Sequence, residues 1–552
     1  MDSGKNRVIV AIDFGTTFSG VAWARSPTSH NGVSSEEVPS EVAYTDKDSK
    51  QEMFWCFQIP TSLPRLRWVQ LGLDPDQKHG ISASLLTQSK KFLGAPYPPD
   101  ATPQSVTTDY LRALIEFVSQ VIKYQVGSVF ETLLFSFVIT VPAVWSQGAK
   151  IRTLTCAEEA GLAKSAPILI VSEPEAAAIH ALKASNPHGL KVDDTVVLCD
   201  AGGGTEDLIT FTIVELSPNL RLREAAPGIV SLCGSTFLNR RFEDFLLKQL
   251  GSCPVFGEDT MEQATQHFEL VAKRRFAGDS HDDFAFPVPG IADNDAVNVR
   301  RGRLHVTGTQ IWDLMLPALQ QVLDLVREQI KISKAPVKSV FLVGGFGQNP
   351  FLRHFIHEAL PSGIEVLAPV DGWTAVVRGA LSKTLFDLCT SAPQVAIDSR
   401  EARKHYGTIK SLKFECSGHK KFYGEFHIKV MEWFIQKGDE IEETKPVVTS
   451  WIEHRHKSQG KVTSIKTTIY ELDGADSKKA PLYFCREMRT HCKLHPILNR
   501  AHQERIPVTR GKDGEDYHTV LYQIHANYYS AHCDYSLWFE GQNHGTVEVE
   551  YL

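Results

Sequence analysis

The chain has 552 residues, of which 42% are hydrophobic and 22% charged, and its formal net charge is −7. A chain of this length exceeds what one hydrophobic core normally supports, so we expect at least two domains. The mildly acidic balance gives no reason to expect nucleic acid or a membrane as a partner, and no apolar run approaches the ~20 residues of a transmembrane helix.

The ten cysteines are scattered along the chain, and the amino end lacks the long apolar core of a signal peptide. A disulfide scaffold would need a denser set of cysteines. We therefore expect a reduced, cytoplasmic protein.

Strands and helices alternate along the first part of the chain. Apolar runs at residues 8–12 and 135–141 predict strands. An apolar stripe at helical spacing between them predicts an amphipathic helix capped by Thr108 or Asp109. Residues 26–105 are rich in Pro and Ser and less periodic, which predicts an inserted subdomain.

The alternation continues to about residue 385. Pro174 is typical of the first turn of a helix, and residues 196–199 predict another strand. Residues 309–333 predict a long amphipathic helix, and residues 339–356 predict a strand, a glycine turn and a helix. This order predicts an α/β domain. Beyond residue 389 only short alternating runs follow, which predict a β-rich domain.

Two distant stretches share one plan. "VIVAIDFGTTFSG" begins at Val8 and "TVVLCDAGGGTEDL" begins at Thr195. In each, an apolar strand ends in aspartate, Asp13 or Asp200, and a glycine turn with threonine follows. Because the two copies lie far apart, they predict two similar lobes rather than a short repeat array.

The shared plan points to a metal and phosphate site. Glycines let the backbone turn sharply, so that its N–H groups can point at a phosphate. A carboxylate beside a phosphate is repulsive unless a cation lies between them, so Asp13 and Asp200 predict a hydrated Mg²⁺ ion. Each stretch alone also fits a tight hairpin turn, and neither is a P-loop.

A third glycine turn, Gly344–Gly345–Phe346–Gly347, follows a predicted strand and leads into a helix. It fits either a backbone approach to a base or ribose or a plain connection between strand and helix.

With these three turns, the chain resembles the heat-shock protein 70 family of the actin-like ATPase superfamily over roughly residues 7–385. "AIDFGTTFSGVA" looks like the first phosphate loop, "CDAGGGTEDL" like the second, and "FLVGGFGQNPFLR" like the adenosine loop. "SKKFLG" and "VSEPEAAAIHAL" are similar to two further family segments. "GSTFLNRRF" and "AVVRGAL" are similar to a divergent branch found in animals and fungi.

The resemblance implies an α/β, two-lobed actin-like ATPase with duplicated ribonuclease H-like lobes, followed by a smaller β-rich domain. That last domain would be a reduced, lidless form of the family's substrate-binding β-sandwich. The implied ranges are 1–388 for the nucleotide-binding domain, with lobe I at 1–188 (insertion 26–105) and lobe II at 189–388 (insertion 226–309), and 389–552 for the β-rich domain.

The resemblance also implies ATP or ADP and Mg²⁺ as cofactors. Asp13 and Asp200 would hold the metal through water, Glu173 with Asp207 would orient the attacking water, and Lys90 would offset developing charge. The remaining implied nucleotide-binding residues are Gly15, Thr16, Thr17, Gly202, Gly203, Gly204, Thr205, Lys273, Arg274, Gly344, Gly345, Phe346 and Gln348.

The sequence departs from the family pattern at several points. Phe346 and Gln348 stand where the family usually has a serine and an arginine at the base. Glu269 lies one residue from the expected spacing. The acidic, leucine-containing linker of the standard chaperones is absent around residues 389–403.

Four functions remain compatible with the sequence. The first is an ATP-binding, slowly hydrolysing chaperone-like protein whose partner is an unfolded or extended polypeptide or a co-chaperone. The second is a nucleotide-binding scaffold with little or no hydrolysis. The third is a small-molecule kinase on the same fold, for which no carboxylate base can be assigned. The fourth is a filament former like actin, which the β-rich tail disfavours.

Overall fold

The computed structural model describes most of the chain. The described residues are 7–26, 33–34, 37–47, 50–60, 62–74, 98, 100–164, 166–184, 189–217, 219–231, 233–388, 395–413, 421–422, 425–443, 445–473, 480–495, 497–498, 500–529, 531–546 and 549–551. The chain divides into two compact units, Met1–Ala396 and Ile397–Leu552. No described helix is long and apolar enough to cross a membrane.

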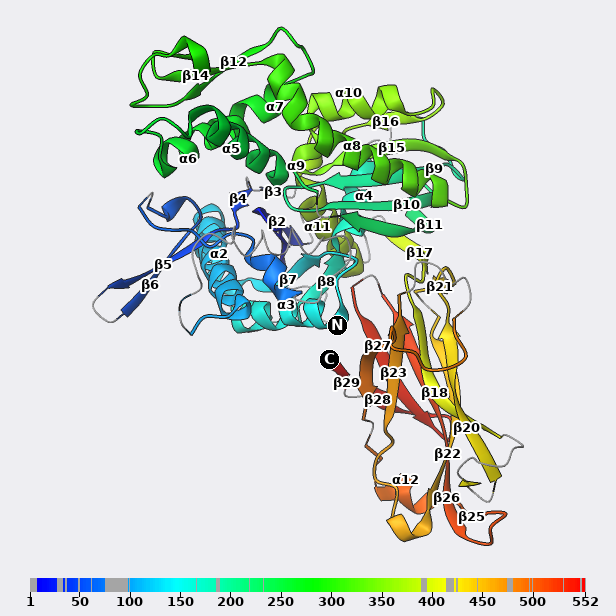
Figure 1. Cartoon of the computed structure of the whole chain (residues 1–552). Helices are drawn as coiled ribbons and strands as arrows, with labels where there is room; N and C mark the ends of the chain where they lie inside the picture. The colour runs from blue at the N-terminus through cyan, green and yellow to red at the C-terminus, as the bar shows by residue number, and fades with distance from the viewer. Residues whose placement is uncertain are drawn as a thin grey trace. The chain divides into compact units, whose positions relative to one another are not determined.

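The first unit contains two sheets with the same plan (Figure 1). In lobe I the strand order is β3–β2–β1–β7–β8, and β4 also pairs with β2. Strand β1 runs antiparallel to β2 and parallel to β7. The bounds are β1 (Arg7–Phe14), β2 (Phe18–Ser26), β3 (Val33–Ser34), β4 (Val38–Pro39), β7 (Leu134–Val141) and β8 (Leu169–Ser172).

Lobe II repeats this plan with the order β11–β10–β9–β15–β16. Strand β9 runs antiparallel to β10 and parallel to β15, as β1 does to β2 and β7. The predicted duplicated, two-lobed α/β fold is therefore confirmed. The bounds are β9 (Thr195–Ala201), β10 (Glu206–Glu215), β11 (Leu220–Ser231), β15 (Val337–Val343) and β16 (Glu365–Leu367).

Each main helix of lobe I has a counterpart in lobe II at the equivalent place in the order of strands and helices. The pairs are α2 (Pro103–Val126) with α8 (Gly308–Ile332), α3 (Gln147–Glu159) with α10 (Pro350–Ala359), and α4 (Glu173–Ala184) with α11 (Ala375–Leu388). Helices α4 and α11 pack so closely that a Cβ at Gly379 would overlap the backbone of Ala176. This contact joins the two lobes.

The start of α2 differs from the sequence prediction. The helix begins at Pro103, and Thr102 and Ser105 form a reciprocal capping box. Thr108 and Asp109, the two expected caps, lie within the helix instead. The apolar stripe begins late because the first turn is polar, whereas Pro at the first position and a Ser/Thr box mark the actual start.

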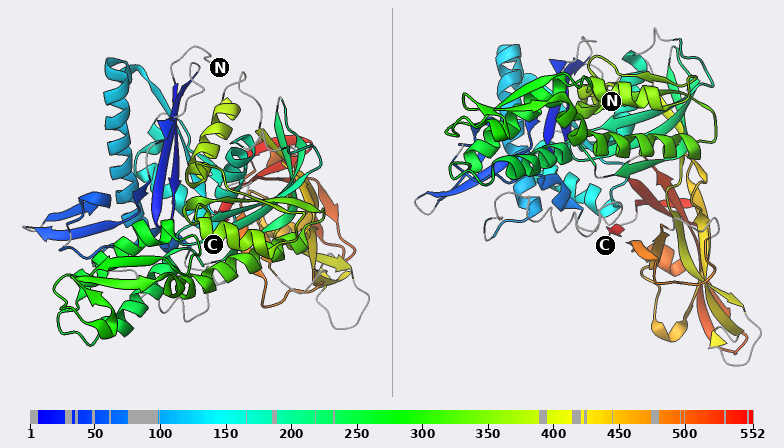
Figure 2. Two further views of the ribbon diagram at one scale, coloured as in Figure 1. Left: turned by 90° about the horizontal axis from the view of Figure 1, so that it is seen from above. Right: turned by 45° about the horizontal axis from the view of Figure 1, so that its top comes forward.

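Each lobe carries an insertion. In lobe I it includes the hairpin β5 (Val42–Lys47) and β6 (Lys50–Trp55), which projects outward (Figure 2). The short helices of lobe I are η1 (Cys56–Gln58), η2 (Val69–Leu73), η3 (Gly127–Thr132) and η4 (Leu162–Lys164). The insertion in lobe II holds α5 (Thr236–Leu250), α6 (Glu258–His267), the π-helical turn η5 (Phe268–Ala272), α7 (Lys273–Arg275), η6 (Asp295–Val297), and a small sheet of β12 (Asp283–Pro287), β13 (Val299–Arg300) and β14 (Arg303–Thr307).

The second unit is a β-sandwich. One sheet has the order β19–β20–β18–β23–β24–β29, and the other has β22–β26–β27–β28 with β25 on β26. The bounds in the first sheet are β18 (His405–Lys413), β19 (Lys421–Phe422), β20 (Glu425–Ile435), β23 (Thr467–Leu472), β24 (Arg489–Leu494) and β29 (Val549–Tyr551). Those in the second are β22 (Val447–His456), β25 (Val508–Arg510), β26 (Asp516–Tyr528), β27 (Cys533–Phe539) and β28 (Gln542–Thr546).

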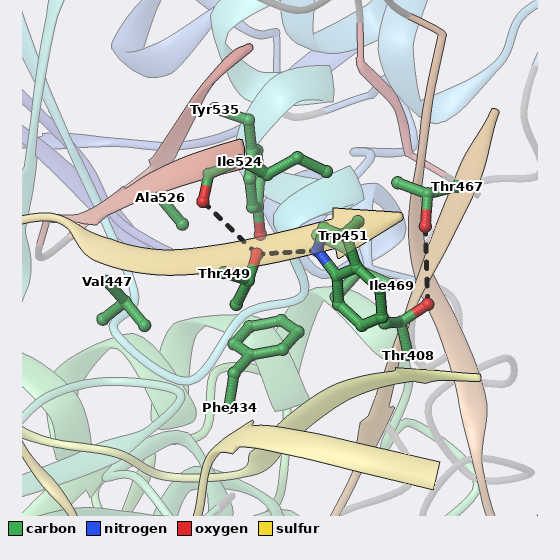
Figure 3. Close-up of a pocket in the computed structure, with 10 residues that line it drawn as sticks. All are labelled: Thr408, Phe434, Val447, Thr449, Trp451, Thr467, Ile469, Ile524, Ala526 and Tyr535. Carbon is green, nitrogen blue, oxygen red and sulfur yellow. Dashed lines mark hydrogen bonds between the residues drawn. The ribbon is translucent and has the colours of Figure 1, made fainter. Parts of the chain in front are cut away.

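Side chains from both sheets form one core, including Ile469, Leu494, Ile524 and Leu537. A void of about 10 Å³ remains between the sheets (Figure 3), which is room for about one water molecule. The strands β17 (Val395–Glu401) and β21 (Glu440–Glu442) pair with each other, and η8 (Lys457–Gln459) and α12 (Arg500–Arg505) are short. The predicted β-rich C-terminal region is confirmed.

Candidate functional site: a cleft between the two lobes

A cavity of about 570 Å³ is lined by residues of both lobes. Its volume lies within the range of small-molecule sites. The predicted residues that line it are Asp13, Gly15, Thr16, Thr17, Glu173, Asp200, Gly202, Gly203, Gly204, Thr205, Lys273, Arg274, Gly344, Gly345, Phe346 and Gln348.

Two predicted residues are not among these. Lys90 lies outside the described residues. Asp207 is buried beside the cavity on β10, directly opposite Asp200 in the β9–β10 register.

The two metal-binding candidates lie at equivalent positions. Asp13 is near the end of β1 and Asp200 near the end of β9, the central strands of their lobes. Thr140 Oγ1 of β7 donates to Asp13 Oδ1 at 2.7 Å, which fixes this carboxylate. The duplicated strands therefore bring both acids to one cavity.

The two glycine–threonine turns face each other across this cavity. A Cβ at Gly204 would lie 2.7 Å from Thr16 Cγ2, and a Cβ at Gly203 would overlap the side chain of Thr17. Only glycine allows the turns to approach so closely. The carbonyl oxygens of residues 202–204 accept bonds from the N–H groups of residues 234–236. These bonds fix the second turn against the start of α5.

Burial and mutual repulsion raise the pKa values of the cavity's acids. Burial raises the pKa of Asp13 to about 6, although the Thr140 hydrogen bond opposes this. Burial and then the nearby acids raise the pKa of Asp200 and of Glu173 well above the usual range. Burial and, to a smaller extent, the charge of Asp13 raise the pKa of Glu37 to about 8. Carboxylates crowded in this way need a cation to remain charged together.

The donor set fits a hydrated divalent cation. Oε1 of Glu173 is buried and has no hydrogen-bond partner among the described residues. Within the same residues, no group of three or more His, Cys, Asp or Glu side chains forms a direct metal cage. Mg²⁺ commonly keeps several of its waters and takes few protein ligands directly, so Asp13 and Asp200 suit an ion held through water.

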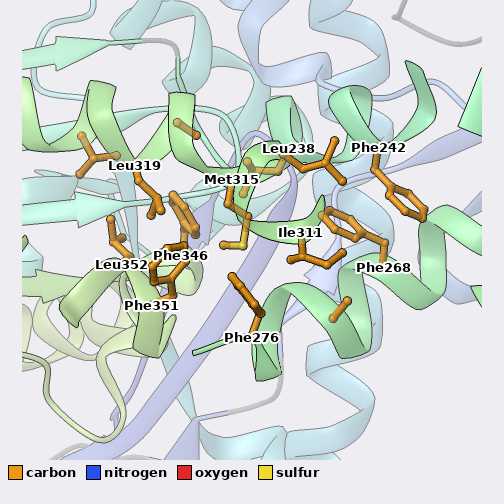
Figure 4. Close-up of a cluster of buried hydrophobic side chains, with 14 of the residues drawn as sticks. Leu238, Phe242, Phe268, Phe276, Ile311, Met315, Leu319, Phe346, Phe351 and Leu352 are labelled. Carbon is orange, nitrogen blue, oxygen red and sulfur yellow. The ribbon is translucent and has the colours of Figure 1, made fainter. Parts of the chain in front are cut away.

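The third glycine turn borders the cavity with its backbone. Gly344 has a φ of +79°, and a Cβ there would overlap the carboxylate of Asp200, so this position requires glycine. The Phe346 side chain instead packs into the core of lobe II with Phe351 and Leu352 (Figure 4). It therefore cannot stack on a ligand.

Trp373 is the aromatic side chain that lines the cavity with a substantial exposed fraction, 37%. It lies in η7 (Gly372–Thr374), just before α11. Gln348 faces the same region, and its Nε2 is buried without a hydrogen-bond partner among the described residues.

The one-residue offset at Glu269 has a structural cause. Residues Phe268–Ala272 form a π-helical turn, which accommodates one extra residue in a helix. Lys273 follows it, and its Nζ donates to Glu269 Oε1 at 3.3 Å and to Asn239 Oδ1 at 3.1 Å. The turn thus places the buried Lys273 and the exposed Arg274 at the cavity.

Sequence reasoning missed several residues that line the cavity. They include Glu37, Gln70, Ser235, Asn349 and Trp373. Glu37 and Gln70 lie in the insertion of lobe I, where no periodic pattern separates them from neighbouring polar residues. For Trp373, the available signal was the family-like stretch "AVVRGAL" that follows it, which forms the start of α11 in the structure.

The comparison with known proteins agrees with this geometry. The sequence model described as Hsp70 protein matches residues 90–383, which is 294 of 552 residues. The chain belongs to the Hsp70 family.

Its relatives are distant. Heat shock 70 kDa protein 12A of Mus musculus is 25% identical over 479 residues, covering 68% of this chain and 69% of that protein. Chaperone protein HscA of Photorhabdus laumondii is 27% identical over 397 residues, covering 68% of this chain and 58% of that protein. Heat shock 70 kDa protein 12B of Homo sapiens is 24% identical over 486 residues, covering 68% of each. The chain is thus a divergent Hsp70-like protein, and its family supports nucleotide binding.

Proposed function

We propose that the first unit binds ATP or ADP with Mg²⁺ in the cavity between the lobes and hydrolyses ATP slowly. The observation that carries this proposal is that both aspartate–glycine–threonine turns line one cavity together with Glu173. Membership of the Hsp70 family supports the nucleotide as ligand.

In this proposal, Asp13 and Asp200 hold the metal through water, and the ion neutralises phosphate charge when bound. The threonines and the N–H groups of the two glycine turns bind the β- and γ-phosphates. Their close packing orients these donors before the ligand arrives, which is the main requirement of phosphoryl transfer.

Glu173 is proposed to orient the attacking water. It begins α4, its carboxylate is buried, and one of its oxygens is unpaired among the described residues. Asp207 supports this acid from beside the cavity, and Lys90 offsets charge on the phosphates.

The base is proposed to lie between Trp373 and Arg274. Both line the cavity, and both are substantially exposed, as a stacking surface must be before the ligand binds. An aromatic face and a guanidinium group each stack well on a base. Trp373 would supply the stacking surface that the family's arginine provides at the position occupied here by Gln348.

Titration calorimetry and a turnover assay test the proposal. We expect Mg²⁺-dependent binding of ATP and ADP, and slow release of phosphate from ATP. Absence of Mg²⁺-dependent binding of either nucleotide would refute the proposal. Addition of sugars or glycerol, with a search for phosphorylated product, separates the kinase alternative.

A scaffold that binds nucleotide with little hydrolysis is the second candidate. The burial of Phe346 favours it, because the third turn then offers only backbone to the ligand. Tight binding of Mg·ATP without phosphate release in a single-turnover assay would select this candidate.

We further propose that the β-rich unit binds an extended polypeptide and that the protein acts in the cytoplasm. The relative HscA is named a chaperone protein, and the scattered cysteines suit a reducing compartment. Turnover of ATP with and without an unfolded polypeptide tests the first point: stimulation supports it, and an unchanged rate contradicts it.

A further inference from the structure

The segment Arg67–Asp74 of lobe I, here called the bridging segment, contacts several separate parts of the first unit. It contains η2 and follows the hairpin β5–β6 in the chain. Its contacts involve the first phosphate loop, the insertion of lobe II and the start of α3.

Gln70 is the central residue of the bridging segment. It is 3% exposed and lines the cavity. Thr16 Oγ1 donates to Gln70 Oε1 at 2.6 Å, and Gln70 Nε2 donates to the carbonyl oxygen of Phe14 at 2.5 Å. Gln70 also lies beside the carboxylate of Glu173, where it lowers the pKa of that acid against the larger opposing effect of burial. One amide group therefore holds the first phosphate loop by two hydrogen bonds and lies beside the acid that we assign to the attacking water.

An amide suits this position because it donates and accepts at the same time. A lysine would only donate, and a glutamate would only accept when ionised, beside Glu173. All of these partners are buried, so a lost hydrogen bond cannot be replaced readily by bulk water.

Trp68, two residues earlier, contacts lobe II. Its ring centroid lies 4.1 Å from the guanidinium carbon of Arg240 on α5, which also lies 5.2 Å from the ring of Phe237. Burial lowers the pKa of Arg240 to about 10. Trp68 adopts a φ of 58°, which bulky residues rarely do. The contact with Arg240 is thus made from a strained backbone position.

The other end of the bridging segment is fixed to lobe I. Ser146, which caps α3, donates through Oγ to Asp74 Oδ1 at 3.0 Å. Arg152 Nε of α3 donates to the carbonyl oxygen of Leu73 at 2.7 Å. The segment is thus held to lobe I at Leu73 and Asp74 and contacts lobe II at Trp68, with Gln70 between these points.

We propose that Gln70 is a positioning residue that sets Thr16 and Glu173 for phosphoryl transfer, and that the Trp68–Arg240 contact makes its position depend on closure of the lobes. This inference rests on the proposed function, because it assumes the roles of Thr16 and Glu173 given there.

The first test uses hydrogen exchange of the nucleotide-free protein. Gln70→Met keeps the length and volume of the side chain but removes its hydrogen bonds. We expect amide exchange in the peptide covering residues 14–17 to become about 5- to 30-fold faster, the effect of losing one to two buried hydrogen bonds. Gln58→Met, at an exposed position of the same lobe, is the matched control and should leave exchange unchanged.

The second test compares binding with chemistry. In Gln70→Met, we expect the single-turnover rate of ATP hydrolysis to fall at least 10-fold while the Kd for Mg·ADP changes less than about 3-fold. Trp68→Ala should lower the rate in the same way. The double variant should be no slower than Gln70→Met alone, because the two residues act through one path.

The outcomes are separable. If the wild-type protein binds no Mg·nucleotide, the proposed function fails and this inference fails with it. If the wild-type protein hydrolyses ATP and Gln70→Met does so equally fast, only the inference is overturned, whatever the exchange data show. If the effects of Trp68→Ala and Gln70→Met add fully, the dependence on closure is overturned.

Discussion

At the scale of single residues, four carboxylates determine the electrostatics of the cavity. Asp13, Asp200, Glu173 and Glu37 are brought together without a protein cation close enough to form an ion pair with them among the described residues. Such an arrangement costs stability in the ligand-free protein, because each burial disfavours the charged form. This cost is expected of a site whose acids would be neutralised by a bound cation. Replacement of one acid can therefore weaken ligand binding without lowering the stability of the ligand-free protein.

Asp200→Asn should weaken Mg²⁺-dependent ADP binding by about 10- to 100-fold while leaving the ligand-free protein as stable or more stable. The neutral amide cannot hold the hydrated ion, but it removes one of the repelling charges. Calorimetric titration and thermal unfolding measure the two effects. Asp244→Asn, at an exposed position on α5, is the control and should change neither.

Trp373→Ala should weaken ADP binding by about 5- to 100-fold, the range for loss of one stacked base. Binding of Mg·pyrophosphate, which has no base, should remain unchanged. Fluorescence or calorimetric titration with both ligands measures this. Equal weakening of both would show that Trp373 supports the phosphate loops and does not contact the base.

At the scale of helices and strands, close contacts join the two lobes of the first unit and connect neighbouring strands of the β-sandwich. Helices α4 and α11 approach so closely at Gly379 that no side chain fits there. In the second unit, Glu471 of β23 contacts His491 Nδ1 of β24 at 3.1 Å and Lys404 Nζ at 2.7 Å. Both contacts connect segments that are distant in the chain.

Gly379→Ala should destabilise the first unit by about 1–3 kcal/mol, because the new methyl group overlaps the backbone of Ala176 and forces the helices apart. Gly363→Ala is the matched control, since a Cβ there has nothing within 4 Å. Chemical denaturation measures both variants. Equal stability of the two would contradict the close crossing of α4 and α11.

Glu471 should make the stability of the β-rich unit depend on acid pH. Burial alone would raise its pKa, but the hydrogen bond from His491 and the contact with Lys404 lower the pKa to about 2. A lowered folded-state pKa adds stability above the unfolded value of 4.5, and this stability is lost as pH falls toward 2. The contribution is on the order of 3 kcal/mol.

Denaturation of the wild-type protein and of Glu471→Gln between pH 7 and pH 2 measures this contribution. The variant should be less stable at pH 7, and the difference should vanish near pH 2. A difference that stays constant with pH would assign the effect to packing rather than charge.

At the scale of the whole molecule, the chain combines two units with different cores. The first builds its cavity from two copies of one strand plan, and the second is a sandwich whose two sheets share a core. The cavity lies entirely within the first unit. A ligand bound in this cavity would therefore stabilise that unit directly.

Calorimetric unfolding should show two transitions. Mg·ADP at about 100 times its Kd should stabilise the transition of the first unit by about 2.7 kcal/mol and raise its Tm. The transition of the β-rich unit should stay in place. A single transition that shifts as a whole would show that the units unfold cooperatively.

The sequence by itself determined the duplicated α/β plan, the acids at the strand ends and the facing glycine turns. Each is a local pattern of an apolar strand, an acid and a glycine turn, so it can be read within about a dozen residues. Family resemblance added Glu173, Lys273 and Arg274. The roles of these residues, like that of Lys90, remain predictions.

Only the tertiary structure decided that Gln70 and Glu37 reach the cavity, that Trp373 lines it and that the side chain of Phe346 turns into the core. These positions depend on where distant segments pack, and neither periodicity nor composition encodes that packing. The π-helical turn before Lys273 shows the same limit. The sequence showed that Glu269 is offset by one residue from the family spacing. Only the structure shows that a π-helical turn accommodates this offset and leaves Lys273 at the cavity.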